Sequence, residues 1–320
     1  MSSMDTFIYN SLPLHRLFIF TVNNSLMRCD LHVHSIFSGM CNTPVLDRIC
    51  RESYNDPAEV YSWLKRLGMS IVTITDHDSI DAAEALRTQS DFFLSEEVTC
   101  RMPSSTELHL GVYGIGERDH VEIQRRRTDF IALLMYLTER KLFFCVNHLF
   151  SGLTGRREEE DFRWLASYVP AFETRNGQMT AKANAGATRL AARLGKIGIA
   201  GSDSHTIGGA GLTYTEVAEA RTVDEFFAGL RAGRSRVHGI HGSYWKLTAD
   251  VFSIIGSLFC EKPWTTSLFP LTALVPAFTA GHWLNEMRFC RKWSAALEKK
   301  EKHPRMLWDI DSSFEANWAS

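Results

Sequence analysis

The feature that most constrains this fold is a regular alternation of short β-rich runs with longer helical stretches over about residues 27–236. Runs of β-branched and aromatic residues predict strands at 27–33, 69–75, 92–99, 108–113, 142–146, 169–173 and 197–201. Helical periodicity predicts helices between them, at 56–67, 119–140, 158–167, 179–194 and 223–232. This spacing predicts an α/β protein whose parallel sheet, either a barrel or open, carries helices outside it.

Composition excludes several classes of protein. A hydrophobic fraction of 45% and a charged fraction of 22% are normal for a soluble globular chain and too apolar for a disordered one. The formal net charge of −2 gives no strong attraction to nucleic acid or to anionic membranes. Seven cysteines without a Cys-x-x-Cys pair indicate reduced thiols, so we expect a cytoplasmic protein.

The two ends of the chain differ from residues 27–241, which we expect to form the main domain. Residues 1–26 make a poor signal peptide and are either an N-terminal extension or a misassigned start, since Met27 directly precedes RCDLHVHS. In 242–320 the composition shifts, and 264–284 carries no Asp, Glu, Lys or Arg over 21 residues. That length fits a membrane span, whereas two prolines and four threonines favour a buried or capping helical tail. The alternative is peripheral membrane contact through 251–284.

Histidines and carboxylates gather near the C-terminal ends of the predicted strands. His32 and His34 lie two positions apart on the first strand, so their side chains point to one face. Further candidates follow in TDHD, SEEVT, ELHLG, VNHLF and SDSH: Asp76, His77, Glu97, His109, His148, Asp203 and His205. These strand ends are where α/β sheets and barrels assemble their sites.

This set of side chains predicts a metal centre. Imidazoles interleaved with carboxylates, without a thiolate cluster, suit Zn²⁺, Mn²⁺ or Fe²⁺. The candidates exceed the four ligands of a structural zinc site, so a multinuclear centre with Glu97 as a bridging carboxylate is the simplest interpretation. Alone, the His-x-His pair is weak evidence and His109 is more typical of a core histidine, but the pattern repeats at five strand ends.

Taken in order, these motifs resemble the PHP (polymerase and histidinol phosphatase) family over about residues 27–236. The resemblance implies a distorted, TIM-like (β/α)7 barrel with two or three divalent ions (Mn, Zn or Fe), followed here by a C-terminal helical tail. It also implies hydrolysis of phosphoesters by a metal-activated hydroxide.

The resemblance further assigns roles to single residues. It implies three metal-binding sets: His32, His34, Glu97 and Asp203; Glu97, His109 and His148; and His77 with His205. Asp76, the candidate catalytic carboxylate, and Asp30 would orient neighbouring imidazoles. The family often has a Glu and an Asn in the turn that is FETRNG here, where Arg175 is the candidate for binding substrate phosphate.

Two departures from the family pattern concern loops. In the string HSIFSGM, Gly39 stands where many members have an aspartate, so the third ion lacks a ligand unless Cys41 or Asp47 substitutes. His148 is followed by Leu149 rather than the usual proline, which affects only the local loop.

We therefore expect a phosphoesterase acting on a small phosphorylated substrate: a nucleotide, a short oligonucleotide or another phosphometabolite. No stripe of basic and aromatic residues indicates a long nucleic-acid track. One alternative is an amidohydrolase-type C–N hydrolase, which normally needs a carboxylated lysine at a strand end, and no predicted strand ends in one. The other is a catalytically degenerate metal-binding regulatory module, which the glycine at position 39 keeps open.

Overall fold

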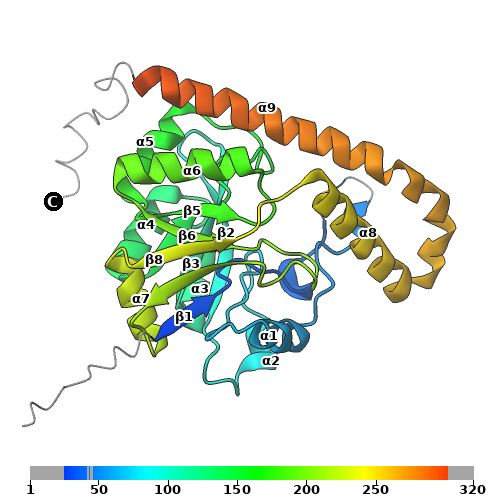
Figure 1. The fold of residues 1–320 in the computed structure, drawn as a ribbon, viewed down its shortest axis with the longest axis horizontal. Coiled ribbons are helices and arrows are strands. Elements are labelled where there is room, and N and C mark those ends of the chain that lie inside the picture. Colours follow the sequence, from blue (N-terminus) through cyan, green and yellow to red (C-terminus); the bar gives the residue numbers. More distant parts are fainter. Residues whose placement is uncertain (1–24, 42, 44–45, 302–320) are drawn as a thin grey trace, which may run out of the picture.

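Two hydrogen-bonded sheets with helices packed around them form the centre of the computed structural model (Figure 1), which describes residues 25–41, 43 and 46–301. The larger sheet has the order β2 (Ser95–Arg101), β3 (Glu107–Tyr113), β4 (Phe143–Val146), β5 (Ala171–Asn176) and β6 (Ile197–Gly201). Its β4, β5 and β6 are parallel, while β2, β3 and β4 are antiparallel. The smaller, antiparallel sheet has the order β1 (Leu26–Cys29), β7 (Thr213–Ala218) and β8 (Ser235–Gly239).

The sequence correctly indicated a mixed α/β fold, but the structure does not have a regular (β/α)7 barrel. The predicted strand at 69–75 is reduced to a single parallel bridge between Val72 and Phe92. A side-chain oxygen replaces a backbone carbonyl as the acceptor there, since Val33 N donates to Thr75 Oγ1 at 3.0 Å. Further single bridges, such as Val33–Ser204, connect the segment after β1 to the segment after β6.

The helices mostly match the predicted segments. They are α1 (Pro57–Arg66), α2 (Ala83–Leu86), α3 (Glu117–Arg126), α4 (Phe130–Glu139), α5 (Glu159–Tyr168), α6 (Ala181–Leu194) and α7 (Val223–Arg231). Short 3-10 turns occur at Ile36–Ser38 and Leu46–Arg48. The single helix predicted at 119–140 is wrong: it is two helices, because Asp129 caps α4 by accepting hydrogen bonds from Ile131 N and Ala132 N.

The alternation of side chains along β3 separates the core from the site. Leu108, Leu110 and Val112 are buried in one apolar cluster with Ile123 of α3 and with residues of α4. Residues of opposite parity, including His109, point to the other face of the strand. Packing of the apolar face thus fixes the orientation of this histidine.

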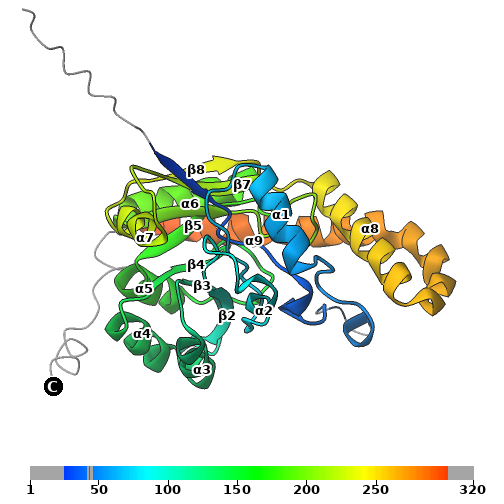
Figure 2. The same ribbon diagram turned by 90° about the horizontal axis from the view of Figure 1, so that it is seen from below.

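The C-terminal part forms a helical arm and a returning helix. The arm is α8 (Tyr244–Glu261), the 3-10 segment η3 (Pro263–Leu274) and the beginning of α9 (Val275–Glu301). It projects away from the sheets, and α9 then runs back past α6 (Figures 1 and 2). On this return Trp293, which lies beyond the predicted buried segment 264–284, is buried in the main core.

The arm itself is more exposed than the sequence suggested. Trp264 is 63% exposed, and other large apolar side chains of the arm are exposed as well: Trp245, Phe269, Leu271, Leu274 and Phe278. Within the described residues, no helix combines the length and apolar character needed to cross a membrane. Peripheral membrane contact through 251–284 stays a prediction, as does the domain boundary after residue 241.

Candidate metal centre

Eight predicted ligand side chains converge on one site. They reach it from strands β2 and β3, from the loops after β4 and β6, and from the irregular segments that follow β1 and α1. In the described chain, four sets have donor atoms within 4.8 Å of one another: His34, His77 and His205; His32, His148 and Asp203; His32, His34 and Glu97; and His77, Glu97 and His109. The structure thus brings the predicted ligands together. The set His32, His34 and Glu97 falls within one of the three expected sets, whereas each of the other three combines residues from two of them.

Glu97 lies at the middle of the cluster and is 1% exposed. Its Oε2 is 3.2 Å from Nε2 of His32 and 3.2 Å from Nδ1 of His77. Its Oε1 is 3.2 Å from Nδ1 of His109 and 3.1 Å from Nε2 of His148. One carboxylate oxygen therefore faces each half of the cluster, which is the arrangement that a bridging ligand requires.

Several buried polar atoms of the cluster have no hydrogen-bond partner within the described residues. They are His32 Nε2, His34 Nε2, His77 Nδ1, His109 Nδ1, His148 Nδ1, His205 Nε2 and Glu97 Oε2. Leaving a buried polar atom unpaired costs free energy, and native structures rarely contain many such atoms. Divalent cations would satisfy imidazole nitrogens and carboxylate oxygens that converge in this way, so these side chains fit a metal centre.

Comparisons with known proteins identify this architecture. Residues 181–235, a segment that holds Asp203 and His205, match the PHP-associated family. A two-domain protein from Bacteroides vulgatus, containing a predicted PHP-like metal-dependent phosphoesterase, superimposes with a TM-score of 0.52. The chain has a PHP-type fold.

The likeness is structural rather than close in sequence. The Bacteroides vulgatus protein shares 16% identity, over 71% of this chain and 70% of its own. PsfC from Pseudomonas syringae matches this PHP-type chain with a TM-score of 0.50 and 16% identity, over 73% of this chain and 98% of its own. No curated protein matches the chain.

Charges in the PHP-type cluster are strongly coupled. Burial alone would raise the pKa of Glu97, but His32, His109 and His77 outweigh it and hold this pKa well below its usual value. Burial lowers the pKa of His32, whereas Glu97, Asp203 and Glu173 raise it well above normal. Burial and the neighbouring His205 lower the pKa of His34 to about 3. Glu97 is thus ionised and His34 is neutral, as metal ligands must be, whereas His32 would have to release a proton to bind an ion.

Two of the predicted ligands have a strained backbone conformation. His148 has a φ of 27° and Asp203 a φ of 50°, in the left-handed region that residues other than glycine rarely adopt. Such strain persists only where the surroundings enforce it, and it clusters at functional sites. Both residues follow a strand of the parallel part of the sheet, so the strain aims their side chains into the cluster.

Glu173 is a site residue to which the sequence gave no role of its own, although the resemblance pointed to a Glu in its turn. Its Oε1 lies 2.9 Å from Nδ1 of His32, and its Oε2 accepts hydrogen bonds from His148 N and Asn176 Nδ2, each at 2.8 Å. The Asn176 amide also donates to Asp203 at 3.0 Å. Glu173 therefore fixes the ring of one ligand and the backbone of another, which is how outer carboxylates orient metal-binding histidines.

The prediction that Asp30 orients an imidazole is wrong. Asp30 instead accepts hydrogen bonds from three backbone amides: His32 N, Ser202 N and Gly211 N. It ties the segment after β1 to the loops around β6, so it shapes the site through the backbone.

Asp76 is connected to the predicted ligand His34 through the hydroxyl of Ser38. Its carboxylate accepts from Ser35 N and from the hydroxyls of Ser35 and Ser38 at 2.6–2.7 Å. The Ser38 hydroxyl in turn lies 2.8 Å from Nδ1 of His34. Asp76 thus positions His34 indirectly, while its predicted catalytic role stays a prediction.

Arg175 does not join the cluster. Its Nη1 donates to Gly239 O at 2.7 Å, next to strand β8. Residues two apart on a regular strand share a face, but the pairing of β5 with β6 shifts register between Glu173 and Arg175. This irregularity separates the two side chains, and binding of substrate phosphate by Arg175 stays a prediction.

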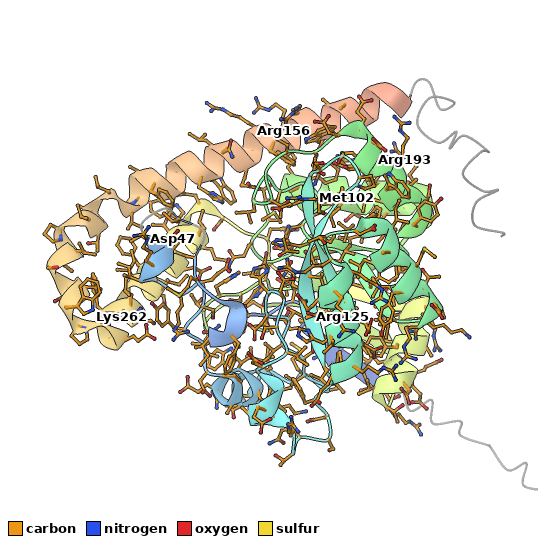
Figure 3. All side chains as sticks on the ribbon, turned by 180° about the vertical axis from the view of Figure 1, so that it is seen from behind. Asp47, Met102, Arg125, Arg156, Arg193 and Lys262 are labelled. Atoms are coloured by element: carbon orange, nitrogen blue, oxygen red, sulfur yellow. The ribbon has the colours of Figure 1, made fainter. Side chains whose placement is uncertain are left out.

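Neither residue suggested as a replacement at position 39 reaches the cluster. Asp47 is exposed, and Figure 3 shows it on the side of the molecule where the arm residue Lys262 lies. The Cys41 thiol lies beside Cys50 instead. The carboxylate that faces the outer histidines is Glu52, whose oxygens lie 3.5 Å from Nε2 of His77 and 3.5 Å from Nε2 of His205.

Proposed function

We propose that this PHP-type protein is a metal-dependent hydrolase acting on a small phosphoester. The observation that carries the proposal is the buried set of unpaired imidazole and carboxylate atoms around Glu97. Two or three divalent ions, Mn, Zn or Fe, would be held by His32, His34, His77, Glu97, His109, His148, Asp203 and His205. The structural likeness to a protein containing a predicted metal-dependent phosphoesterase supports this function.

Bound divalent ions would supply a water-derived nucleophile near neutral pH and charge neutralisation for phosphate oxygens. The protein's part is to fix the geometry of that site. Glu97 spans both halves of the cluster, and Asn147 holds its Oε1 through a hydrogen bond of 2.8 Å. Glu173 occupies Nδ1 of His32, which leaves Nε2 of that ring free to face the cluster.

The proposed substrates are small: a nucleotide, a short oligonucleotide or another phosphometabolite. Loops choose the substrate in folds of this kind. The amidohydrolase alternative is weaker, because it normally needs a carboxylated lysine at a strand end, and none of the strands β1–β8 ends in a lysine.

Hydrolysis of phosphoesters by the full-length chain tests the proposal. The metal-stripped protein would be supplied with Mn²⁺, Zn²⁺ or Fe²⁺ and offered a panel of phosphomonoesters, phosphodiesters and N-acyl substrates. We expect phosphoester turnover that depends on added metal and that Glu97→Gln lowers to the level of the stripped protein. The matched control is Glu107→Gln, an exposed glutamate on the adjacent strand, which should retain full turnover.

Two results would contradict the proposal. Turnover of N-acyl substrates alone would favour the amidohydrolase alternative. Binding of two or more ions without turnover of any phosphoester would favour the degenerate regulatory module.

A further inference from the structure

Two histidines, His77 and His205, lie at the outer edge of the cluster. The aspartate that many family members have as a further ligand there is a glycine, Gly39, in this chain. His77 and His205 both face Glu52, with one carboxylate oxygen 3.5 Å from each Nε2. Nε2 of His205 is buried and has no hydrogen-bond partner among the described residues. A separation of 3.5 Å is too long for a good hydrogen bond, so the two carboxylate oxygens each lie opposite one of the two rings without a good hydrogen bond to it.

The backbone places Glu52 beside the position of the missing aspartate. Glu52 N donates to Gly39 O at 3.1 Å, and Met40 pairs with Arg51 in an antiparallel bridge. The chain thus leaves the site after Gly39, makes a loop and returns beside it at Glu52. This return brings Glu52 next to Gly39, the position where many members of the family have an aspartate.

The helical arm holds this loop in place. Nε of Arg51 lies 2.9 Å from Oε1 of Glu261, and Nζ of Lys262 donates to Ile49 O at 2.7 Å. Both contacts join the end of α8 to residues within three positions of Glu52. Burial raises the pKa of Glu52, but His205 and His77 outweigh burial and keep it well below the usual value, so the carboxylate is ionised.

We propose that Glu52 is the carboxylate ligand of a third divalent ion, which it shares with His77 and His205. This inference rests on the proposed function, because it concerns an additional ion of the same centre. In this arrangement the contacts with the arm hold the residues next to Glu52, and Glu52 lies beside Gly39.

Metal content measured on the full chain tests this inference. The protein would be loaded with Mn²⁺, dialysed against metal-free buffer, and analysed for Mn per chain, next to Glu52→Gln and Asp47→Asn. Asp47→Asn is the matched control, because Asp47 is an exposed carboxylate on the same loop. We expect three ions per chain in the wild type and in the control, and two in Glu52→Gln.

The remaining outcomes are distinct. Three ions in Glu52→Gln, or two in the wild type, would overturn the assignment of Glu52 while leaving the proposed function intact. One ion or none in the wild type would instead contradict the multinuclear centre itself. Glu52→Asp, which keeps the charge, separates a lost ligand from a collapsed loop, and we expect it to retain the third ion with weaker affinity.

Discussion

At the scale of single residues, Glu173 shows how a ligand depends on its neighbours. In Glu173→Gln, the amide NH₂ would face either the donors His148 N and Asn176 Nδ2 or Nδ1 of His32, which would then lose the acceptor that fixes its tautomer. We expect the affinity for Mn²⁺ to fall by about 10–100-fold, the usual effect of losing such a partner. Calorimetric titration of the metal-free protein measures it. Glu107→Gln is the control, and equal affinities in the two variants would refute the role of Glu173.

His77 makes metal binding dependent on pH. Glu97 and Glu52 outweigh the effect of burial and raise the pKa of His77 from 6.5 to about 9. In the metal-free protein, this charged form adds stability that is complete below about pH 6.5 and is lost as pH rises through about 9. An ion must displace that proton, so its affinity grows over the same interval.

We therefore expect added Mn²⁺ to raise the melting temperature more at about pH 9 than at about pH 6.5. Thermal unfolding with and without metal across this interval provides the measurement. A metal-induced increase that is constant with pH, or that shrinks as pH rises, would be inconsistent with a protonated His77.

The cluster of eight candidate ligands could be predicted from the sequence, because imidazoles and carboxylates at successive strand ends mark a site. The contacts that hold these side chains in place could not be predicted. Asp30 and Asp76 are of a residue type that can orient imidazoles, but their hydrogen-bond partners depend on backbone geometry that the sequence does not display. Glu52 escaped notice because it lies thirteen residues beyond Gly39 along the chain, while a hydrogen bond joins the two in space.

At the scale of elements, Asp161 illustrates how a helix start is anchored. The sequence predicts a helix at 158–167, and in α5 (Glu159–Tyr168) Asp161 is the third residue of the first turn. This buried carboxylate accepts from Glu158 N, Ser104 Oγ and Thr106 Oγ1. It therefore joins the helix start to the turn between β2 and β3.

We expect Asp161→Ala to lower the free energy of unfolding by about 2–4 kcal/mol, since it removes a helix cap and leaves three hydrogen-bond donors without an acceptor. The metal content should not change, because these contacts lie outside the cluster. Urea unfolding compares it with Asp224→Ala, an exposed carboxylate in the first turn of α7, for which we expect a change within about 0.5 kcal/mol. Equal stability of the two variants would rule out the anchoring role.

Strands with strong apolar runs were predictable, and β6 matches its predicted bounds, 197–201. Strands β7 and β8 were not predicted, since they pair with β1 across the molecule and follow the glycine-rich loop after the last ligands. The segment at 69–75 has strand-like composition, but Thr75 satisfies backbone groups with its side chain there. Local propensity cannot distinguish that outcome from a regular ladder.

At the scale of the whole molecule, α9 contributes to the main core. Trp293 is 5% exposed and packs against Phe162 and Phe289, with ring centroids 5.1 and 6.4 Å apart. The same helix supplies Glu286, whose carboxylate accepts from Gly152 N in the loop after His148. The C-terminal helix thus supports both the core and a loop of the site.

We expect Trp293→Ala to lower the free energy of unfolding by about 3–5 kcal/mol, the usual cost of truncating a buried Trp. Arg288→Ala, an exposed position on the same helix, should change it by less than about 0.5 kcal/mol. Chemical denaturation provides both values, and a tryptophan variant as stable as the wild type would mean that α9 does not stabilise the core.

The central claim is that the cluster around Glu97 is a multinuclear metal centre, and an anomalous difference map from crystals of the Mn-loaded protein tests it most directly. We expect two peaks, one on each side of the Glu97 carboxylate, and a third peak between Glu52, His77 and His205. A map without any peak in this cluster, or with a single peak that Glu97 does not contact, would rule out a multinuclear centre bridged by Glu97.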